Sequence, residues 1–224
     1  MTHLEVELQQ LKQEVVDMMQ LVKQQLQKSE QAIIDMDTAT AQEIIHHETR
    51  VNAYELSIDR NCENIFALFN PVAVDLRFVL AALKINNQLE RIGDHAEAIA
   101  KYVLELEKPF DDTLIKQIKF HKMYETSLSM IDDFIEAYEN EDTTLAREVF
   151  QKDSALNKIN NSAGKVIAEF AQKNPEKIQE ILFLFSTIRK LERVGDLAKN
   201  VAEETIFFIE AKVLKHEKKK KKLS

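Results

Sequence analysis

A six-residue motif with two acidic residues occurs twice in this sequence. LERIGD over residues 89–94 returns as LERVGD over residues 191–196, with five of the six positions identical. Residues four positions apart lie on the same face of an α-helix, so each copy presents its glutamate and aspartate together. Paired carboxylates of this kind can bind metal ions. The candidate ligands from this motif are Glu90, Asp94, Glu192 and Asp196.

Each copy of the motif also contains a glycine. A glycine inside a helix costs about 1 kcal/mol relative to alanine, yet Gly93 and Gly195 hold the same place in both copies. Close helix packing would explain these glycines, although it leaves the acidic residues beside them unexplained. We therefore expect another group to approach the helix backbone closely at Gly93 and Gly195.

A second set of oxygen-bearing residues, also spaced by four, precedes each motif. If the chain folds back at its Asn-Pro breaks, Glu55 comes within a helical turn of Glu90, and Asp153 comes level with Asp196. Carboxylates gathered in this way repel one another unless cations lie between them. Oxygen ligands favour Mg²⁺, Mn²⁺, Ca²⁺ or iron over zinc or copper. The residues of this second set are Glu55, Asp59, Asp153 and Asn157.

The composition indicates the elements that must position these residues. The chain has 224 residues but only three glycines and three prolines, too few for the turns of an all-β fold. Apolar residues make up 45% and charged residues 30%, which is typical of long amphipathic helices. Apolar spacing and capping residues predict six long helices, of which the first five end near residues 35, 70, 107, 140 and 174. The fourth helix is predicted to be unbroken and to begin at a cap over residues 111–113. The sixth helix is predicted to have Asn174 as its N-cap and Pro175 as its first helical residue.

The repeat predicts how these helices are grouped. We expect an all-α fold of two tandem three-helix bundles, with six long antiparallel helices and a pseudo-two-fold internal repeat. The first bundle spans residues 1–108 and the second residues 109–214, followed by a lysine-rich disordered tail over 215–224. The opening helix has an apolar stripe of heptad type, which could serve a dimer or its own bundle.

Charge and hydropathy exclude several classes of function. The net charge is −8, and because the last ten residues carry six lysines against one glutamate, the rest of the chain carries about −13. Such an acidic body disfavours nucleic acid as a partner. The apolar runs are too short to span a bilayer, and the single cysteine, Cys62, is expected to be a buried thiol in a reducing compartment. We therefore expect a cytoplasmic protein, whose basic tail could reach anionic lipid.

Three features of the sequence occur together: Ile58-Asp59, NPVAVDLR over residues 70–77 and the doubled LER[IV]GD motif. In these features, and in their order over nearly the whole chain, the sequence resembles the PhoU family of phosphate-signalling regulators. It implies two tandem three-helix bundles that bind multinuclear metal clusters of Mg, Mn, Fe or Zn through their acidic motifs. Asn157 replaces an acid of the family motif, so weaker or smaller metal loading is expected at the second site. The implied ligands are Glu55, Asp59, Glu90 and Asp94 in the first site, and Asp153, Asn157, Glu192 and Asp196 in the second.

The resemblance also implies a role that is not catalytic. PhoU proteins couple the ATPase subunit of a phosphate-import ABC transporter to a sensor histidine kinase of the membrane. They restrain phosphate uptake and the phosphate-starvation response when phosphate is plentiful, which is negative regulation. A homodimer, and membrane association only through these partners, are expected.

Two other classes of function were weighed against this role. A carboxylate-bridged di-iron oxidase requires two Glu-x-x-His motifs, and only Glu43 and His46 provide one. His95 follows Asp94 and is expected to be a polar surface residue. A plain helical scaffold would account for the composition but not for the twin motifs. No glycine-rich phosphate loop is present in the sequence, so ATP binding of that kind is excluded.

Overall fold

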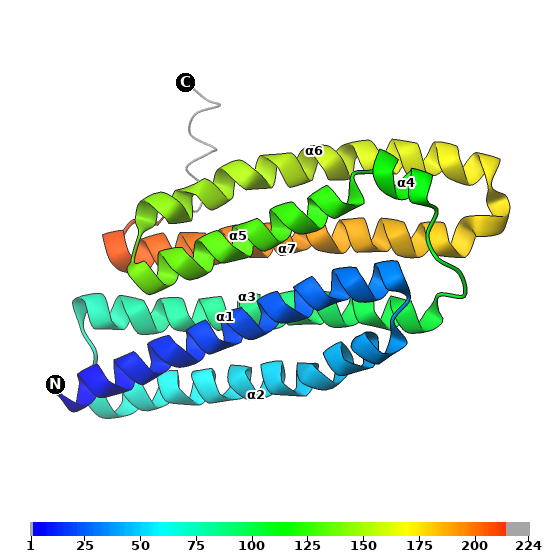
Figure 1. Cartoon of the computed structure of the whole chain (residues 1–224). Helices are drawn as coiled ribbons and strands as arrows, with labels where there is room; N and C mark the ends of the chain where they lie inside the picture. Colours follow the sequence, from blue (N-terminus) through cyan, green and yellow to red (C-terminus); the bar gives the residue numbers. More distant parts are fainter. Residues whose placement is uncertain (1, 214–224) are drawn as a thin grey trace, which may run out of the picture.

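The computed structural model describes residues 2–213 and is built from helices that run along one long axis (Figure 1). No strand occurs among these residues, and no helix among them is long and apolar enough to cross a membrane. The predicted tail at 215–224 lies outside the described residues. The helices are α1 (His3–Asp35), α2 (Thr38–Phe69), α3 (Ala73–Glu105), α4 (Asp112–Gln117), α5 (Phe120–Asn140), α6 (Thr143–Lys173) and α7 (Ile178–Glu210), with a short 3-10 helix η1 (Pro175–Lys177) before α7.

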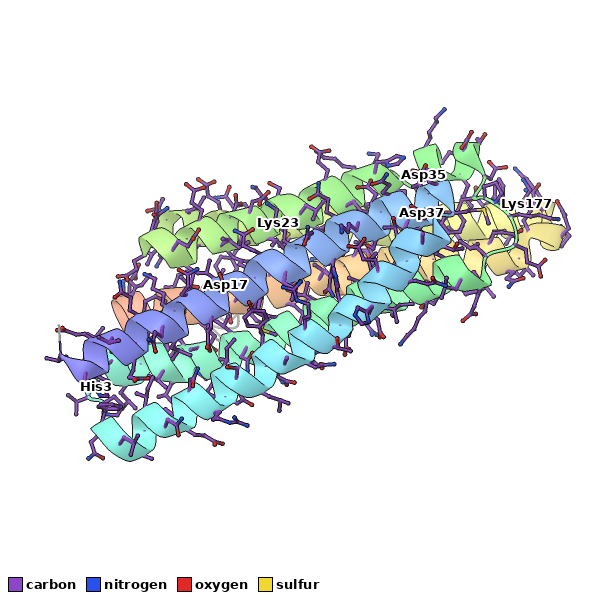
Figure 2. All side chains as sticks on the ribbon, turned by 60° about the horizontal axis from the view of Figure 1, so that its bottom comes forward. His3, Asp17, Lys23, Asp35, Asp37 and Lys177 are labelled. Carbon is purple, nitrogen blue, oxygen red and sulfur yellow. The ribbon has the colours of Figure 1, made fainter. Side chains whose placement is uncertain are left out.

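The helices form two three-helix bundles lying side by side. Helices α1, α2 and α3 pack together, and so do α5, α6 and α7, while α3 and α7 meet along the centre of the molecule (Figure 1). Figure 2 shows the α1–α2 turn, marked by Asp35 and Asp37, towards the same end of the molecule as Lys177, with His3 at the opposite end. The α2–α3 hairpin turns at the opposite end of the molecule from the α6–α7 hairpin, which is the arrangement of two bundles related by a pseudo-two-fold axis across the long axis (Figure 1).

The apolar stripe of the opening helix is buried inside the chain. Leu11, Val15, Met18, Val22 and Leu26 are fully buried, and α1 packs on α2 and α3 of its own bundle and on α5 of the other. This stripe therefore does not provide a surface for a dimer, and the homodimer stays a prediction. Burial of these side chains is the main source of stability for α1, because helix propensity alone is marginal in water.

The single helix predicted between residues 113 and 140 is broken in two. Helix α4 ends at Gln117, and Lys119 takes a left-handed conformation, with φ 55°, before α5 begins. Leu114 and Ile118 before the break and Phe120 after it are all buried. In a continuous helix Leu114 and Ile118 would share one face and Phe120 would lie on roughly the opposite side, so the break allows Phe120 to face the core as well.

The role predicted for Asn174 also differs. Its side chain does not cap the following helix; the Asn174 amide donates instead to the carbonyl of Phe170, and so helps to close α6. Pro175 begins η1 as its first residue, and α7 starts only at Ile178. Asp37, Asp111 and Asp142 cap α2, α4 and α6 with their side chains, so the cap predicted at 111–113 is confirmed.

An ion pair between the first turn of α6 and the end of α7 predicts one feature of acid unfolding. Arg147 donates two bonds, of 2.9 and 3.1 Å, to the carboxylate of Glu210, and these bonds, followed by hydrogen bonds from Thr143 and Lys212, lower the pKa of Glu210 to about 2. A lowered carboxyl pKa stabilises the fold above the unfolded value near 4.5, and this contribution is lost as the pH falls towards 2. Arg147→Met should therefore lower the melting temperature at pH 7 and flatten its fall between pH 4.5 and 2. Thermal unfolding followed across this range, with the exposed Arg189→Met as the control, tests it; equal pH profiles would contradict it.

Candidate metal centre

The α2–α3 hairpin has the register that the sequence predicts. The Asn86 amide donates one bond of 2.9 Å to the carbonyl of Glu55 and another of 2.9 Å to the carboxylate of Asp59. Glu55 lies close enough to Glu90 for its charge to raise the pKa of Glu90, together with burial, the largest cause, and with Asp94. Asp59 instead lies level with Asn86, one helical turn before Glu90.

The group that approaches Gly93 is a buried carboxylate on α2. A Cβ added at Gly93 would lie 3.1 Å from Glu48 Oε2 and 3.1 Å from a methyl group of Val51. The Glu48 side chain therefore rests against the backbone of α3 at the one position that carries no side chain. This contact explains the glycine, and the expected close approach is found, but Glu48 is not among the ligands predicted from the sequence.

Glu48 is an unusual residue for a helix interface. Glu48 is only 6% exposed, and neither carboxylate oxygen has a hydrogen-bond partner of good distance and angle, although the Gln25 side chain of α1 lies close enough to interact with it. Burial, and then the charges of Asp94, Glu97 and Glu90, raise its pKa to about 7; Gln25, which faces Glu48 from α1, partly offsets this rise. A buried carboxylate without partners is costly. Glu48 is therefore the carboxylate of the first half that a nearby cation would stabilise most.

The second half repeats this contact with different side chains. A Cβ added at Gly195 would lie 2.4 Å from a methyl group of Leu156 and 3.7 Å from Asp153 Oδ1. Asp153 and Leu156 thus correspond to Glu48 and Val51. The sequence carried a signal for this pairing, because ETRVN over residues 48–52 matches DSALN over residues 153–157 in its acid, hydroxyl, aliphatic and asparagine positions. By this register Glu48 and Asn52, rather than Glu55 and Asp59, correspond to Asp153 and Asn157.

A lysine lies among the carboxylates of the second half. Lys199 Nζ is 2.9 Å from Asp153 and 2.6 Å from Asp196, which brings these two predicted residues together. Burial alone would lower the pKa of Lys199, but its bonds to the two aspartates outweigh this and raise the pKa. The Asn157 amide nitrogen donates to Asp153 Oδ2 at 2.9 Å, so the amide presents its nitrogen to the carboxylate.

The predicted ligands are only partly assembled in this structure. Glu90 and Asp94 share the face of α3 next to Glu48. Glu192 lies one turn before Asp196 on α7 in the same way, and it is partly buried. Among residues 2–213, no three carboxylate, histidine or thiol groups are gathered tightly enough to hold a metal ion as they stand. Binding of an ion would therefore require side-chain rotation at the surface of the α2–α3 hairpin.

The two halves differ in how well they fit a metal ion. In the first half, Glu48 offers two buried oxygens without partners, with Glu90 and Asp94 beside them. This donor set suits a hard cation, which would relieve the mutual repulsion of the carboxylates. In the second half an ammonium group already holds Asp153 and Asp196. The donor set of the first half is therefore better suited to a metal ion than that of the second.

Two other predictions concern the histidines His95 and His46. His95 is not an open surface residue: it is half-buried, its Nε2 has no partner, and burial and then the charges of Lys190, Arg193 and Arg91 lower its pKa to about 4. Glu43 and His46 are exposed, and Glu43 accepts a bond of 2.6 Å from Lys28. Side chains on the outside of α2 cannot form a di-iron centre in a bundle interior.

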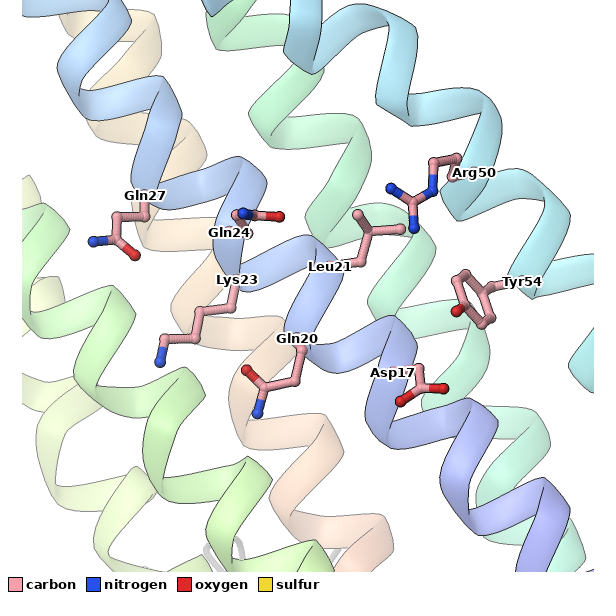
Figure 3. Close-up of a pocket in the computed structure, with 8 residues that line it drawn as sticks. All are labelled: Asp17, Gln20, Leu21, Lys23, Gln24, Gln27, Arg50 and Tyr54. Carbon is pink, nitrogen blue, oxygen red and sulfur yellow. The ribbon is translucent and has the colours of Figure 1, made fainter.

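A polar groove lies between α1 and α2, separate from the acidic residues (Figure 3). It has a volume of about 490 Å³. Figure 3 shows Arg50 and Tyr54 of α2 on the side of Leu21 of α1, whereas Gln20, Lys23 and Gln27 point to the other side of α1. Asp17 is the one carboxylate in its lining. The groove therefore lacks the clustered acids that metal binding requires.

Comparison with known proteins decides the family. Two segments, residues 15–103 and 120–205, each match the PhoU domain, one in each bundle. The chain belongs to the PhoU family. A PhoU homologue of Aquifex aeolicus, a phosphate-specific transport system accessory protein, is 31% identical over 96% of this chain and 97% of its own length. One from Borreliella burgdorferi is 32% identical over 86% of this chain and 88% of its own length.

Solved structures of PhoU proteins share the fold. The crystal structure of PhoU from Pseudomonas aeruginosa superposes with a TM-score of 0.85 and 28% identity, over 93% of this chain and 99% of that one. The phosphate transport system regulatory protein PhoU from Streptococcus pneumoniae gives a TM-score of 0.85 and 29% identity, over 95% and 99%. The predicted all-α architecture of two tandem bundles is therefore confirmed.

Proposed function

We propose that this chain is a regulatory accessory protein of a phosphate transport system, without catalytic activity of its own. The observation that carries the proposal is the PhoU match in both bundles, supported by relatives of nearly full length that are named phosphate-specific transport system accessory proteins. In this role it binds the ATPase subunit of a phosphate ABC transporter and a sensor histidine kinase on the cytoplasmic side. It restrains uptake and the starvation response when phosphate is plentiful.

The proposed role uses the first-half carboxylates as a metal site. Glu48, Glu90 and Asp94 would hold the ion, with Asn52 and Glu55 next to them on α2 and with Mg, Mn, Fe or Zn as the candidate metals. The bound ion supplies positive charge that offsets the repulsion among these groups. Because the ligands come from two helices, binding fixes α2 against α3. A rigid acidic surface of this kind suits docking to a protein partner.

Capture of the transporter ATPase subunit tests the proposal. The tagged full-length chain should retain this subunit from a membrane extract, and should retain several-fold more at high phosphate than at low phosphate. The Glu90→Gln/Asp94→Asn variant should lose bound metal, because two of the carboxylates become neutral, and should lose at least half of the captured subunit. Immunoblotting of the subunit and elemental analysis of the chain measure the two effects.

A matched variant separates this effect from a general loss of negative charge. Glu136 and Glu139 are exposed on α5, away from the hairpin, and Glu136→Gln/Glu139→Gln should leave capture and metal content unchanged. Capture that ignores phosphate and is equal in all three chains would contradict the regulatory role. Oxygen consumption by the iron-loaded chain would instead support an oxidase.

A further inference from the structure

The two halves differ in charge three residues after each motif aspartate. Glu97 holds this position in α3, and Lys199 holds it in α7. Glu97 pairs with Lys101 at 2.6 Å on its own helix, and its charge acts on Glu48. Lys199 bridges two helices instead, through its contacts of 2.9 and 2.6 Å with the two aspartates. One repeat thus adds a negative charge where the other supplies a cation.

We infer that the Lys199 ammonium takes the place of a metal ion in the second half, so that only the first half responds to metal. The inference deepens the metal binding proposed above and rests on it for the first half. It assigns to one chain a metal-dependent bundle and a metal-independent bundle, despite the doubled motif.

The surroundings of Lys199 support the replacement of a metal ion by its ammonium group. Asp153 is only 7% exposed and its Oδ1 has no hydrogen-bond partner, so it is a buried ligand oxygen of the kind that Glu48 provides in the first half. A lysine ammonium is a compact cation with three donors, and here it joins a carboxylate from α6 to one from α7. A divalent ion bound to the same two carboxylates would lie within a few ångströms of this ammonium and be strongly repelled.

The Asn157 amide acts in the same direction. Its nitrogen, rather than its oxygen, is turned to Asp153, so it serves as a donor to the carboxylate and not as a ligand for a cation. Lys199 and Asn157 together satisfy Asp153 Oδ2 without metal. In the first half Asn52 is exposed, and neither oxygen of Glu48 has such a partner.

Removal of the lysine in a chain whose first site is disabled tests the inference. The full-length Glu90→Gln/Asp94→Asn chain is stripped with a chelator, and Mn²⁺ binding is measured by calorimetry and by metal content after dialysis. Adding Lys199→Gln should give Mn²⁺ binding at least tenfold tighter than in this background, and Mn²⁺ should then raise the melting temperature. Adding Lys158→Gln, which removes an exposed lysine of α6, should change neither.

A second pair of variants keeps the test decisive if Lys199→Gln does not fold. Asp94 and Asp196 are both exposed, so substitution of either should be tolerated. In the otherwise unchanged chain, Asp94→Asn should lower the bound Mn²⁺ at least tenfold, whereas Asp196→Asn should leave it unchanged. Equal losses in the two variants, or a folded Lys199→Gln chain that gains no Mn²⁺, would overturn the inference.

These outcomes also separate the inference from the proposed function. A parent chain that binds no Mn²⁺ would refute the proposed metal site of the first half. A gain of binding on Lys199→Gln would still support the exchange in the second half. If the parent chain binds Mn²⁺ as expected but does not capture the transporter ATPase subunit, the regulatory role is contradicted and the inference about Lys199 is not.

Discussion

Glu48→Gln should stabilise the metal-free protein by about 1–3 kcal/mol and weaken its metal binding by at least tenfold. The stabilisation is expected because the substitution removes a buried charge whose two oxygens have no partners and which faces Asp94, Glu90 and Glu97. The loss of affinity is expected because the same carboxylate is the buried ligand of the proposed site. A gain in stability together with a loss of binding is typical of a functional residue held in an unfavourable environment.

Urea unfolding in chelator, and Mn²⁺ titration of the folded chain, measure the two effects of Glu48→Gln. Glu63→Gln is the matched control: Glu63 is exposed on α2, and its substitution should change each quantity little. A Glu48→Gln chain that is less stable than the parent in chelator would show that an internal partner holds this carboxylate. Unchanged Mn²⁺ affinity would remove Glu48 from the site.

The three glycines of this chain should respond very differently to alanine. At Gly195 the new Cβ would lie 2.4 Å from a methyl group of Leu156, which is fully buried. Overpacking of this kind costs more than the gain of about 1 kcal/mol in helix propensity, so we expect a net loss of about 2 kcal/mol. At Gly164 nothing lies within 4 Å, and alanine there should stabilise the chain by about 1 kcal/mol.

Gly93→Ala should be nearly neutral in stability but should weaken metal binding. Its neighbours, at 3.1 Å, are the Glu48 carboxylate and a methyl group of Val51. A small shift of these groups makes room for the Cβ, but it moves the proposed ligand. Chemical unfolding of the three alanine variants, with Mn²⁺ titration of Gly93→Ala, checks the series. Equal unfolding free energies for Gly195→Ala and Gly164→Ala would contradict the packing argument.

The sequence by itself determined the helices, their order and the two related halves. Asp37, Asp111 and Asp142 mark helix starts through local backbone bonds, and the fold-back at Asn70-Pro71 follows from residues next to each other in the chain. The doubled motif is also a local pattern in the chain, so it predicts the pseudo-symmetry and the two close-approach glycines. The break at Lys119 was not predictable in this way, because it depends on how Leu114, Ile118 and Phe120 share the core.

Only the tertiary structure decided which acid of α2 lies against Gly93 of α3. Glu48, Glu55 and Asp59 fall on one stripe of the helix, and helical spacing alone cannot choose among them. The choice depends on the register and crossing of two packed helices, which bring Glu48 onto the bare backbone of Gly93. The pairing of Lys199 with Asp153 is decided in the same way, since a long side chain reaches a partner on another helix only after the bundle has formed.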